Sequence, residues 1–209
     1  TLIVLSADHG GPEVPGYLRS LGDDVAHVDP APFDAAALNK QLREKTGEDA
    51  DLVKTFFTPY VYLDQELVAA RGLDLSAVQQ AVAELVMARP EVFTAYTATD
   101  ISAGRLPDGP LARMAAANYQ PRRSGDVHIV FGSQEFIADF DGLTVASTHG
   151  SPWHYDRHVP VVFAGGGLKP AHISRAVTPY DIAATLANWL NIEAPSGSIG
   201  VVLPEVVKP

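Results

Sequence analysis

Two kinds of apolar segment alternate along this chain of 209 residues, and the alternation limits the folds it can adopt. Short runs of apolar residues, at 2–6, 92–97, 127–131, 145–148 and 159–164, are typical of strands. Between them lie segments with apolar residues three or four positions apart, as in amphipathic helices. Continuous apolar strands suit a parallel sheet covered on both faces. The pattern predicts an α/β protein, a layered α/β/α sandwich with a mostly parallel central sheet.

Residues with capping preferences mark the expected helix ends. Asp34 fits the N-cap of a helix that ends near Gly47. Ser76 and Gln79 have the spacing of a capping box and are expected to begin a second helix, which stops at Pro90. Two further helices are expected at 110–118, after the helix-starting Pro110, and at 178–191, where Asn191 fits the end.

The middle of the chain, about residues 47–133, has its own alternation of strands and helices. We expect it to form an inserted α+β subdomain. Within it, residues 53–63 are expected to be extended, with Pro59 either at a sheet edge or interrupting the strand.

Composition excludes several classes of partner. The net charge is −10 and no basic cluster is longer than Arg122-Arg123, which argues against nucleic acid. No apolar run approaches the roughly 18 residues needed to cross a membrane, so no membrane partner is expected. The absence of cysteine leaves His, Asp, Glu and hydroxyl oxygens as the ligands for any metal ion.

Asp8 and His9 follow the first expected strand directly. In open α/β sheets, ligands bind outside the carboxyl ends of strands. A carboxylate and an imidazole at such an end can reach one cation, and Gly10 and Gly11 remove side-chain bulk beside them. The alternative is structural: Asp8 caps a turn and His9 lies on the surface.

A second group of candidates lies in "STHGSPWHYDRHVPVVFAGGG". His149 ends a strand and is followed by glycine, as His9 is. His154 and His158 have a helical metal-ligand spacing, but the flanking prolines argue against a helix, so both are expected in a loop. Asp156 could orient a metal-bound histidine, or form a local turn or an ion pair.

Four segments resemble the alkaline phosphatase superfamily in the same order along the chain. "LSADHGG" resembles its T-A-D-H-G element, and the segment containing His149 resembles its H-G-S/T-x-x-x-Y-D-x-x-V-P element. "SRAVTPYDIAATLANWLNIEAPSGSIGVVL" is similar to its closing segment, and "RRSGDVHIVF" matches the PafA-type branch, which is also related to type I phosphodiesterases and nucleotide pyrophosphatases. The two His-Gly elements together are specific.

The resemblance implies a metal-dependent hydrolase of phosphate esters, a phosphomonoesterase with an alkaline-phosphatase-like fold. Two zinc ions would act on the phosphoryl group, and a Thr or Ser nucleophile would form a phospho-enzyme. Asp8 and His9 would ligate one zinc and His149 the other. The resemblance also implies a periplasmic or secreted protein.

The family's nucleophile and its remaining metal ligands precede the D-H-G strand, with which this sequence begins. The nucleophile is therefore expected upstream of Thr1, and no catalytic residue is assigned within the chain itself. Residues 1–209 are therefore expected to be the C-terminal part of an alkaline-phosphatase-like catalytic domain, which needs the N-terminal part of the same domain as a partner and is inactive alone.

Two other functions stay open. One is a phosphodiesterase, nucleotide pyrophosphatase or sulfatase relative, whose small-molecule substrate differs. The other is a non-catalytic α/β module.

Overall fold

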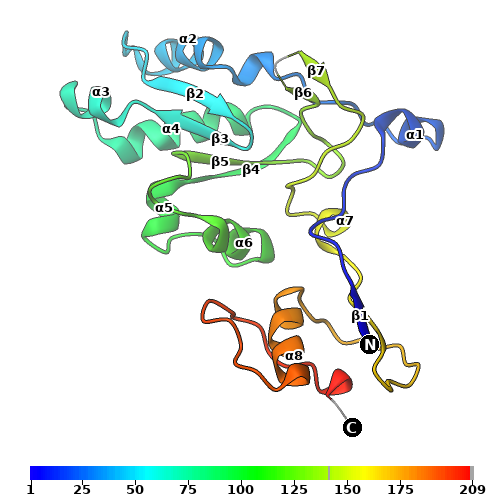
Figure 1. Cartoon of the computed structure of the whole chain (residues 1–209). Helices are drawn as coiled ribbons and strands as arrows, with labels where there is room; N and C mark the ends of the chain where they lie inside the picture. Colours follow the sequence, from blue (N-terminus) through cyan, green and yellow to red (C-terminus); the bar gives the residue numbers. More distant parts are fainter. Residues whose placement is uncertain (141, 208–209) are drawn as a thin grey trace. The chain divides into compact units, whose positions relative to one another are not determined.

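The computed structural model describes residues 1–140 and 142–207, which form two compact units (Figure 1). Unit 2 is the continuous segment 11–153, and unit 1 combines residues 1–10 with the chain from residue 154 onward. Unit 2 therefore interrupts unit 1 in the sequence. The expectation of a subdomain over residues 47–133 stays a prediction.

A four-stranded sheet in the order β2-β3-β5-β4 forms the centre of unit 2. Its strands are β2 (Val53–Phe57), β3 (Tyr60–Leu63), β4 (Val92–Thr97) and β5 (Val127–Phe131), and each neighbouring pair is antiparallel. The segment 53–63, which was expected to be extended, is thus a hairpin of two strands with Pro59 between them. This agrees with one of the two expectations, that Pro59 interrupts the strand.

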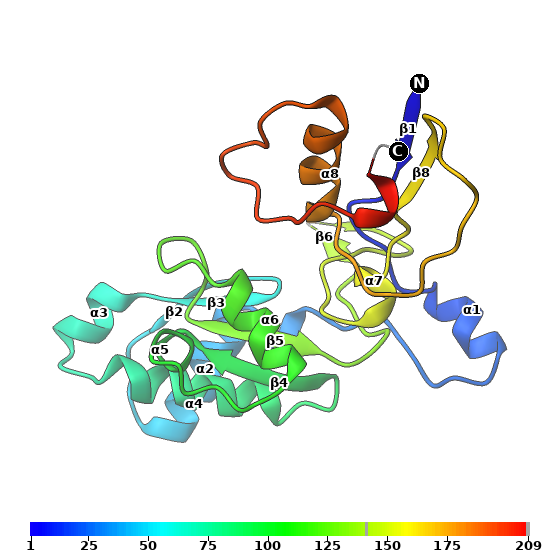
Figure 2. The same ribbon diagram turned by 90° about the horizontal axis from the view of Figure 1, so that it is seen from below.

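Helices cover both faces of this sheet (Figures 1 and 2). Helix α2 contacts β2 and α4, and α4 contacts β4 and β5 on the same face. Helices α5 and α6 lie on the opposite face. The helices and remaining short elements of unit 2 are α1 (Pro15–Ser20), η1 (Ala31–Phe33), α2 (Ala35–Thr46), α3 (Gln65–Ala70), α4 (Leu75–Met87), α5 (Ala98–Ser102), α6 (Pro110–Asn118), β6 (Asp139–Phe140) and β7 (Leu143–Thr144).

The core of unit 2 follows from side-chain alternation along β5. Val127 and Ile129 point to the α2/α4 face and are fully buried there, whereas Val130 lies in a smaller cluster with Ala112 and Ala115 of α6. Successive residues of a strand point to opposite faces, so one apolar run serves both layers. The larger cluster consists mainly of Val, Leu and Ile side chains from α2, α4 and the strands.

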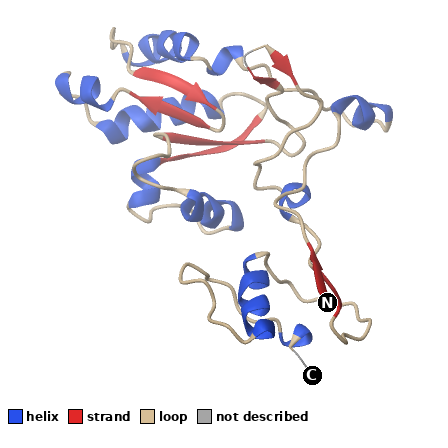
Figure 3. Cartoon of the chain, in the orientation of Figure 1, coloured by secondary structure: helices blue, strands red, loops and turns tan. Residues whose placement is uncertain are grey.

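Unit 1 is smaller and its sheet is a two-stranded antiparallel ribbon. Strand β1 (Leu2–Leu5) pairs with β8 (Val162–Gly165), with Ile3 opposite Ala164 and Leu5 opposite Val162. Figure 3 shows the ribbon as a pair of strands beside long loops. The helical elements of the unit are α7 (His154–Arg157), α8 (Tyr180–Leu190) and η2 (Pro204–Val206).

The α/β class is confirmed, but strand direction differs from the expectation of a mostly parallel sheet. Among the described residues every named strand pair is antiparallel, and the parallel pairing is one isolated bridge between Val28 and Ile137. An apolar run indicates burial, not direction. The burial is incomplete as well, because Ile3 and Leu5 are each 62% exposed.

Helix ends with a local cap match the expectations best. Asp34 accepts a hydrogen bond from the amide of Ala37, and Gly47 ends α2 in the left-handed region at φ 76°. Helix α6 runs over Pro110–Asn118 as predicted, and Asn191 ends α8 with φ 54°. These caps need only neighbouring residues, which is why the sequence reveals them.

Two local expectations are wrong. The capping box does not form: Asp74 is the N-cap of α4, and Gln79 is buried, where its amide donates to Asp126. The expected strand at 145–148 is irregular backbone after the short β7. No helix in the described part of the chain is long and apolar enough to cross a membrane.

Candidate metal-binding site

Asp8 and His9 lie in unit 1, just beyond the end of β1. The Asp8 side chain is 90% exposed and that of His9 is 39% exposed, so both are open to a ligand. Asp8 Oδ2 lies 3.7 Å from His9 Nε2. The backbone leaves the strand before Asp8, and the two adjacent side chains therefore point to the same side instead of alternating.

A hydrogen bond to Gly10 fixes the chemical state of the His9 ring. His9 Nδ1 lies 2.6 Å from the carbonyl oxygen of Gly10. A carbonyl oxygen can only accept, so Nδ1 carries the proton and donates it. In the neutral ring the lone pair is then on Nε2, the nitrogen beside Asp8. Metal-binding histidines in proteins are oriented in this way.

Gly10 allows this segment to lie against α7. Its amide donates to the carbonyl of Asp156 at 2.7 Å, and a Cβ at Gly10 would lie 2.1 Å from the carbonyl oxygen of Tyr155. That distance is far below van der Waals contact. A side chain at position 10 would therefore displace the backbone that carries His9.

The expectation of a loop is corrected for His154, which begins α7, whereas His158 lies in irregular backbone just after this helix, as expected. The single turn of helix over His154–Arg157 fits between the flanking prolines, and the two imidazole rings stack at 4.5 Å. Prolines outside a helix do not prevent one turn, because each is beyond the hydrogen-bonded residues. Asp156 of the same turn is buried, with 3% exposure.

The two donors fit adjacent positions of a tetrahedral zinc site. Zinc binds carboxylate oxygen and imidazole nitrogen at about 2.0–2.2 Å, which puts two tetrahedral ligands roughly 3.4 Å apart. The Oδ2–Nε2 separation of 3.7 Å is close to that value. The pair supplies two of four positions. In residues 1–140 and 142–207 no group of three or more His, Asp or Glu is placed to hold a metal ion.

His149, the third predicted ligand, lies in unit 2 and is exposed. The loop before it contacts the start of the same unit. Ser147 Oγ donates to the carbonyl of Pro12 at 2.7 Å, and a Cβ at Gly11 would lie 2.9 Å from the carbonyl oxygen of Thr148. Gly11 thus permits the close approach of these two loops. The sequence alone indicates only that Gly10 and Gly11 remove side-chain bulk, not which backbone lies against them.

Thr1, upstream of which the nucleophile is expected, is exposed and joins the end of the β1–β8 ribbon through its backbone. Its carbonyl oxygen accepts a hydrogen bond from the amide of Gly166 at 2.8 Å. A Cβ at Gly165 would lie 2.5 Å from the same oxygen, so the glycine permits this close pairing. Thr1 thus has a structural part in the ribbon, and the nucleophile expected upstream of it stays a prediction.

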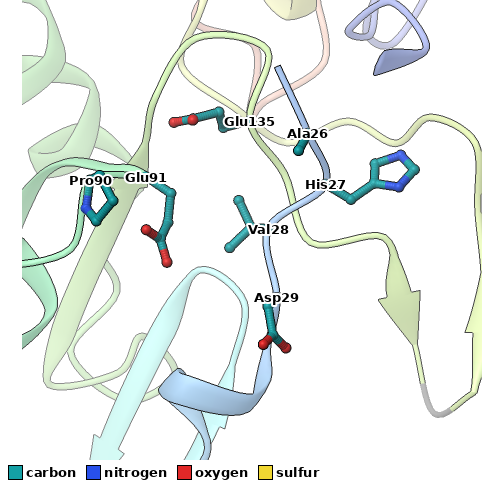
Figure 4. Close-up of a pocket in the computed structure, with 7 residues that line it drawn as sticks. All are labelled: Ala26, His27, Val28, Asp29, Pro90, Glu91 and Glu135. Atoms are coloured by element: carbon teal, nitrogen blue, oxygen red, sulfur yellow. The ribbon is translucent and has the colours of Figure 1, made fainter. Parts of the chain in front are cut away.

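Unit 2 also contains an acidic cavity of about 280 Å³ that the sequence did not indicate. Figure 4 shows Val28 pointing toward Glu91, and His27 on the other side of the backbone. Burial, followed by the charge of Glu91, raises the pKa of Glu135. The carboxylate of Glu91 forms an ion pair with Arg89 at 2.6 Å, so Arg89 compensates part of the negative charge of the cavity.

Comparison with known proteins identifies relatives over nearly the whole chain, although no family model matches. The chain is 31% identical to a protein named calcium-transporting ATPase of Myroides odoratus, matching 99% of this chain and 37% of that protein. It is 28% identical to alkaline phosphatase PafA of Elizabethkingia meningoseptica, matching 99% of this chain and 36% of PafA.

Solved structures give the same result. The crystal structure of wild-type PafA matches with a TM-score of 0.80 at 27% identity, covering 99% of this chain and 38% of the PafA chain. Alkaline phosphatase PhoK of a Sphingomonas species is 30% identical, with 95% of this chain and 36% of PhoK covered. The chain thus spans little more than a third of the length of these relatives.

Proposed function

The chain belongs to the alkaline phosphatase superfamily, and from that premise we propose that it forms part of a metal-dependent hydrolase of phosphate monoesters. Asp8 and His9 bind one zinc ion of a two-zinc site, and His149 binds the other. A Thr or Ser nucleophile and the remaining ligands come from chain outside these 209 residues, upstream of Thr1. The chain alone does not turn over substrate.

The observation that supports this proposal is the arrangement of Asp8 and His9 at the end of β1. Their donor atoms are 3.7 Å apart, both side chains are open, and the Nδ1 proton of His9 is held by Gly10. A capping Asp would accept amide hydrogen bonds from the following turn, whereas Asp8 accepts one from the adjacent His9 amide at 3.1 Å. The side chains are therefore disposed for an external ligand.

Each residue has a definite part in the proposed reaction. The carboxylate of Asp8 brings negative charge to the cation, and His9 Nε2 brings a neutral donor whose direction the Gly10 carbonyl sets. A bound zinc supplies Lewis acidity toward a phosphoryl oxygen and lowers the pKa of a bound hydroxyl or water. The rest of the chain is acidic, so attraction of a phosphate ester depends on charge at this site.

Zinc titration of the purified chain tests the proposal. We expect the chain to bind zinc weakly. In Asp8→Ala and in His9→Ala the zinc affinity should fall by at least about 10–100-fold, the loss that is typical when residues around a bound metal ion are changed. Calorimetry measures the affinity. His27→Ala is the matched control, because His27 is an exposed histidine of unit 2 and should leave the affinity unchanged.

Hydrolysis assays complete the test. We expect no steady release of nitrophenol from p-nitrophenyl phosphate by the 209-residue chain, because the nucleophile is not in it. Zinc-dependent release that survives a combined Asp8→Ala and His149→Ala change would contradict the proposed site. Release that is lost in this double variant would contradict only the expectation that the chain is inactive alone.

The substrate is proposed to be a small phosphate ester, including nucleotides. One relative is named an ATPase, and others are named alkaline phosphatases. Bis-(p-nitrophenyl) phosphate and p-nitrophenyl sulfate serve as comparison substrates for the diesterase and sulfatase alternatives. We also propose a periplasmic or secreted location, from the family resemblance.

A further inference from the structure

Two histidines of unit 1 are not used by the candidate zinc site. His154 begins α7, and His158 follows the last residue of that helix, four positions along the chain. In the sequence, the flanking prolines argue against a metal-ligand role for this spacing because they predict a loop. The structure removes the objection: the amide of His158 donates to the carbonyl of His154 at 2.8 Å and closes a helical turn.

The imidazole rings of these two residues lie against each other. Residues four apart on a helical turn project from the same face, and here the ring centroids are 4.5 Å apart with the ring planes inclined by 21°. Both residues are exposed, so a cation can approach the rings from solvent. The turn therefore presents two nitrogen ligands side by side.

Small rotations of the rings convert this stack into a chelate. A metal ion that binds imidazole at about 2.0 Å holds two neighbouring nitrogens roughly 2.8–3.3 Å apart, the smaller value applying to a square-planar ion. Rotation about the last side-chain bond of histidine is soft, so both rings can turn toward one ion at little cost.

The backbone of the turn is held in place, which preserves the spacing of the pair. The carbonyl of Asp156 accepts a hydrogen bond from the amide of Gly10 at 2.7 Å, and the Asp156 side chain is buried, with 3% exposure. Two histidines in an open loop would have to be ordered when the ion binds, whereas this pair is ordered beforehand.

The ligand type selects the class of metal. Imidazole suits late first-row transition metal ions, whereas Mg²⁺ and Ca²⁺ prefer oxygen ligands. Within that series Cu²⁺ binds most tightly, and its tetragonal geometry accepts two adjacent nitrogens. Within the described ranges no third His, Asp or Glu completes a group that could hold a metal ion, so water would fill the other positions.

We propose that His154 and His158 form a two-histidine binding site for a late transition metal ion, with Cu²⁺ the most tightly bound. The site goes beyond the proposed phosphatase function and does not depend on it. The protein has a net charge of −10, which favours the accumulation of cations at its surface.

Copper titration of the 209-residue chain tests the site. Cu²⁺ quenches the fluorescence of a nearby indole, and Trp153 directly precedes His154. The affinity for the first equivalent of Cu²⁺ should fall at least about tenfold in His154→Ala and in His158→Ala, since even altered outer partners of a ligand cost that much. His172→Ala, at another exposed histidine of unit 1, is the matched control. Unchanged affinity in either single variant would overturn the proposal.

Folding of the variants is checked by circular dichroism. Both histidines are exposed and alanine is the best helix former, so the variants should keep the spectrum of the unaltered chain. Electron paramagnetic resonance of the complex with one equivalent of Cu²⁺ gives a second measurement, which needs no variant. It should show two imidazole nitrogens on one ion, and a single nitrogen would overturn the proposal.

A double variant distinguishes one shared ion from two separate ions. A chelated ion needs both rings, so the combined His154→Ala and His158→Ala change should weaken Cu²⁺ binding little more than either change alone. Such non-additivity is expected of residues that act as a unit. Losses that add would identify two independent single-histidine sites and overturn the assignment.

Asp8→Ala separates this site from the candidate zinc site. The change should leave Cu²⁺ binding by the histidine pair as it is, and a loss equal to that of His154→Ala would show one common site and overturn the proposal. The double histidine variant removes the pair from the zinc titration. A chain that then binds no zinc through Asp8 and His9 contradicts the proposed function and leaves the copper site intact.

Discussion

At the scale of single residues, Gly10 orients His9 in the candidate site although it offers no side-chain ligand to a metal ion. Its carbonyl holds the Nδ1 proton of His9, and its missing side chain lets its amide reach Asp156. The chemistry of His9 is thereby coupled to the packing of α7. A glycine after a histidine is a weak signal in a sequence, since only the structure shows which backbone atoms a Cβ would meet.

Gly10→Ala should weaken zinc binding although both ligands remain. The added Cβ would meet the Tyr155 carbonyl, and the backbone must shift by an ångström or more to relieve the contact. We expect a loss within the roughly 10–100-fold range typical of altered outer partners of a metal ligand. Calorimetric zinc titration measures it, and Gly16→Ala, at an open position in α1, is the control. Equal affinity in Gly10→Ala and the unaltered chain would contradict the role given to Gly10.

His128 makes the stability of unit 2 dependent on pH. It lies on β5 against Tyr60, with ring centroids 4.8 Å apart, and its Nδ1 is buried without a hydrogen-bond partner among the described residues. Burial lowers the pKa of His128 from 6.5 to about 4. The unfolded chain therefore binds more protons between these values, and the free energy of unfolding falls as the pH drops through this window.

The size of this effect can be measured with a variant that does not titrate. A shift of this magnitude corresponds to roughly 3 kcal/mol at most, lost between pH 7 and pH 4. In His128→Phe, which keeps an aromatic ring beside Tyr60, urea unfolding should show a flatter dependence on pH. The exposed-site control His27→Phe should retain the original slope. The same slope in all three proteins would contradict the assignment to His128.

At the scale of elements, the start of α8 is tied to the chain that follows the helix. The Asp181 carboxylate accepts amide hydrogen bonds from Val201 and Thr178, each at 2.8 Å. These bonds, the one from Val201 foremost, lower the pKa of Asp181. Thr185 Oγ1 accepts from the amide of Leu203 in the same contact region. Asp181 and Thr185 of α8 thus hold the segment around residues 201–203 against the helix.

Asp181→Ala should destabilise α8 by roughly 1.5–3 kcal/mol, the range for a hydrogen bond to a charged group. Because the pKa of Asp181 is lowered in the fold, this stabilisation is present above the ordinary value of 3.8 and is lost as the pH falls below it. Hydrogen exchange of α8 amides measures the effect, with the unit 2 sheet as internal reference. Asp181→Asn keeps one acceptor oxygen but loses the charge, so it should have a smaller effect than Asp181→Ala, and no effect at all would show that the charge is not involved.

The elements predicted from sequence are those whose signals are local. The ends of α2, α6 and α8 depend on a cap, a proline or an asparagine within one turn. The start of α4 was misjudged because Gln79 is used elsewhere, by Asp126 and the amide of Thr99. Strand direction depends on partners far along the chain, which no local pattern specifies.

The candidate site was predictable in part for the same reason. Asp8 and His9 are neighbours, so their shared position followed from the strand end alone. The helical turn of α7 beside them depends on the contact of Gly10 with Asp156, almost 150 residues away along the sequence. Whether His149 joins the other two ligands stays a prediction.

At the scale of the whole molecule, the two units differ in how much core they contain. Unit 2 has a sheet covered on both faces, with apolar clusters on each side. Unit 1 has a small core around Ala184 and Ala187 of α8, and several of its large apolar side chains, such as Ile3 and Leu5, are exposed. Burial of apolar area is the main favourable term in folding, so independent stability should be concentrated in unit 2.

Residues 11–153 produced as a separate polypeptide should therefore fold cooperatively. Both ends of this segment belong to the unit, and its sheet and core lie entirely within it. Thermal unfolding followed by circular dichroism should show one sigmoidal transition, as small single domains do. A gradual, non-cooperative change would mean that unit 2 depends on residues of unit 1.

The interruption of unit 1 by unit 2 also has a consequence during protein synthesis. Leu2 pairs with Gly165, so β1 leaves the ribosome about 160 residues before its partner strand. At about 5–20 residues per second, β1 waits roughly 8–33 s for β8. Throughout that interval β1 lacks its partner β8, while the whole of unit 2 is made and can fold. Unit 1 can therefore close its ribbon only after the whole of unit 2 has been synthesised.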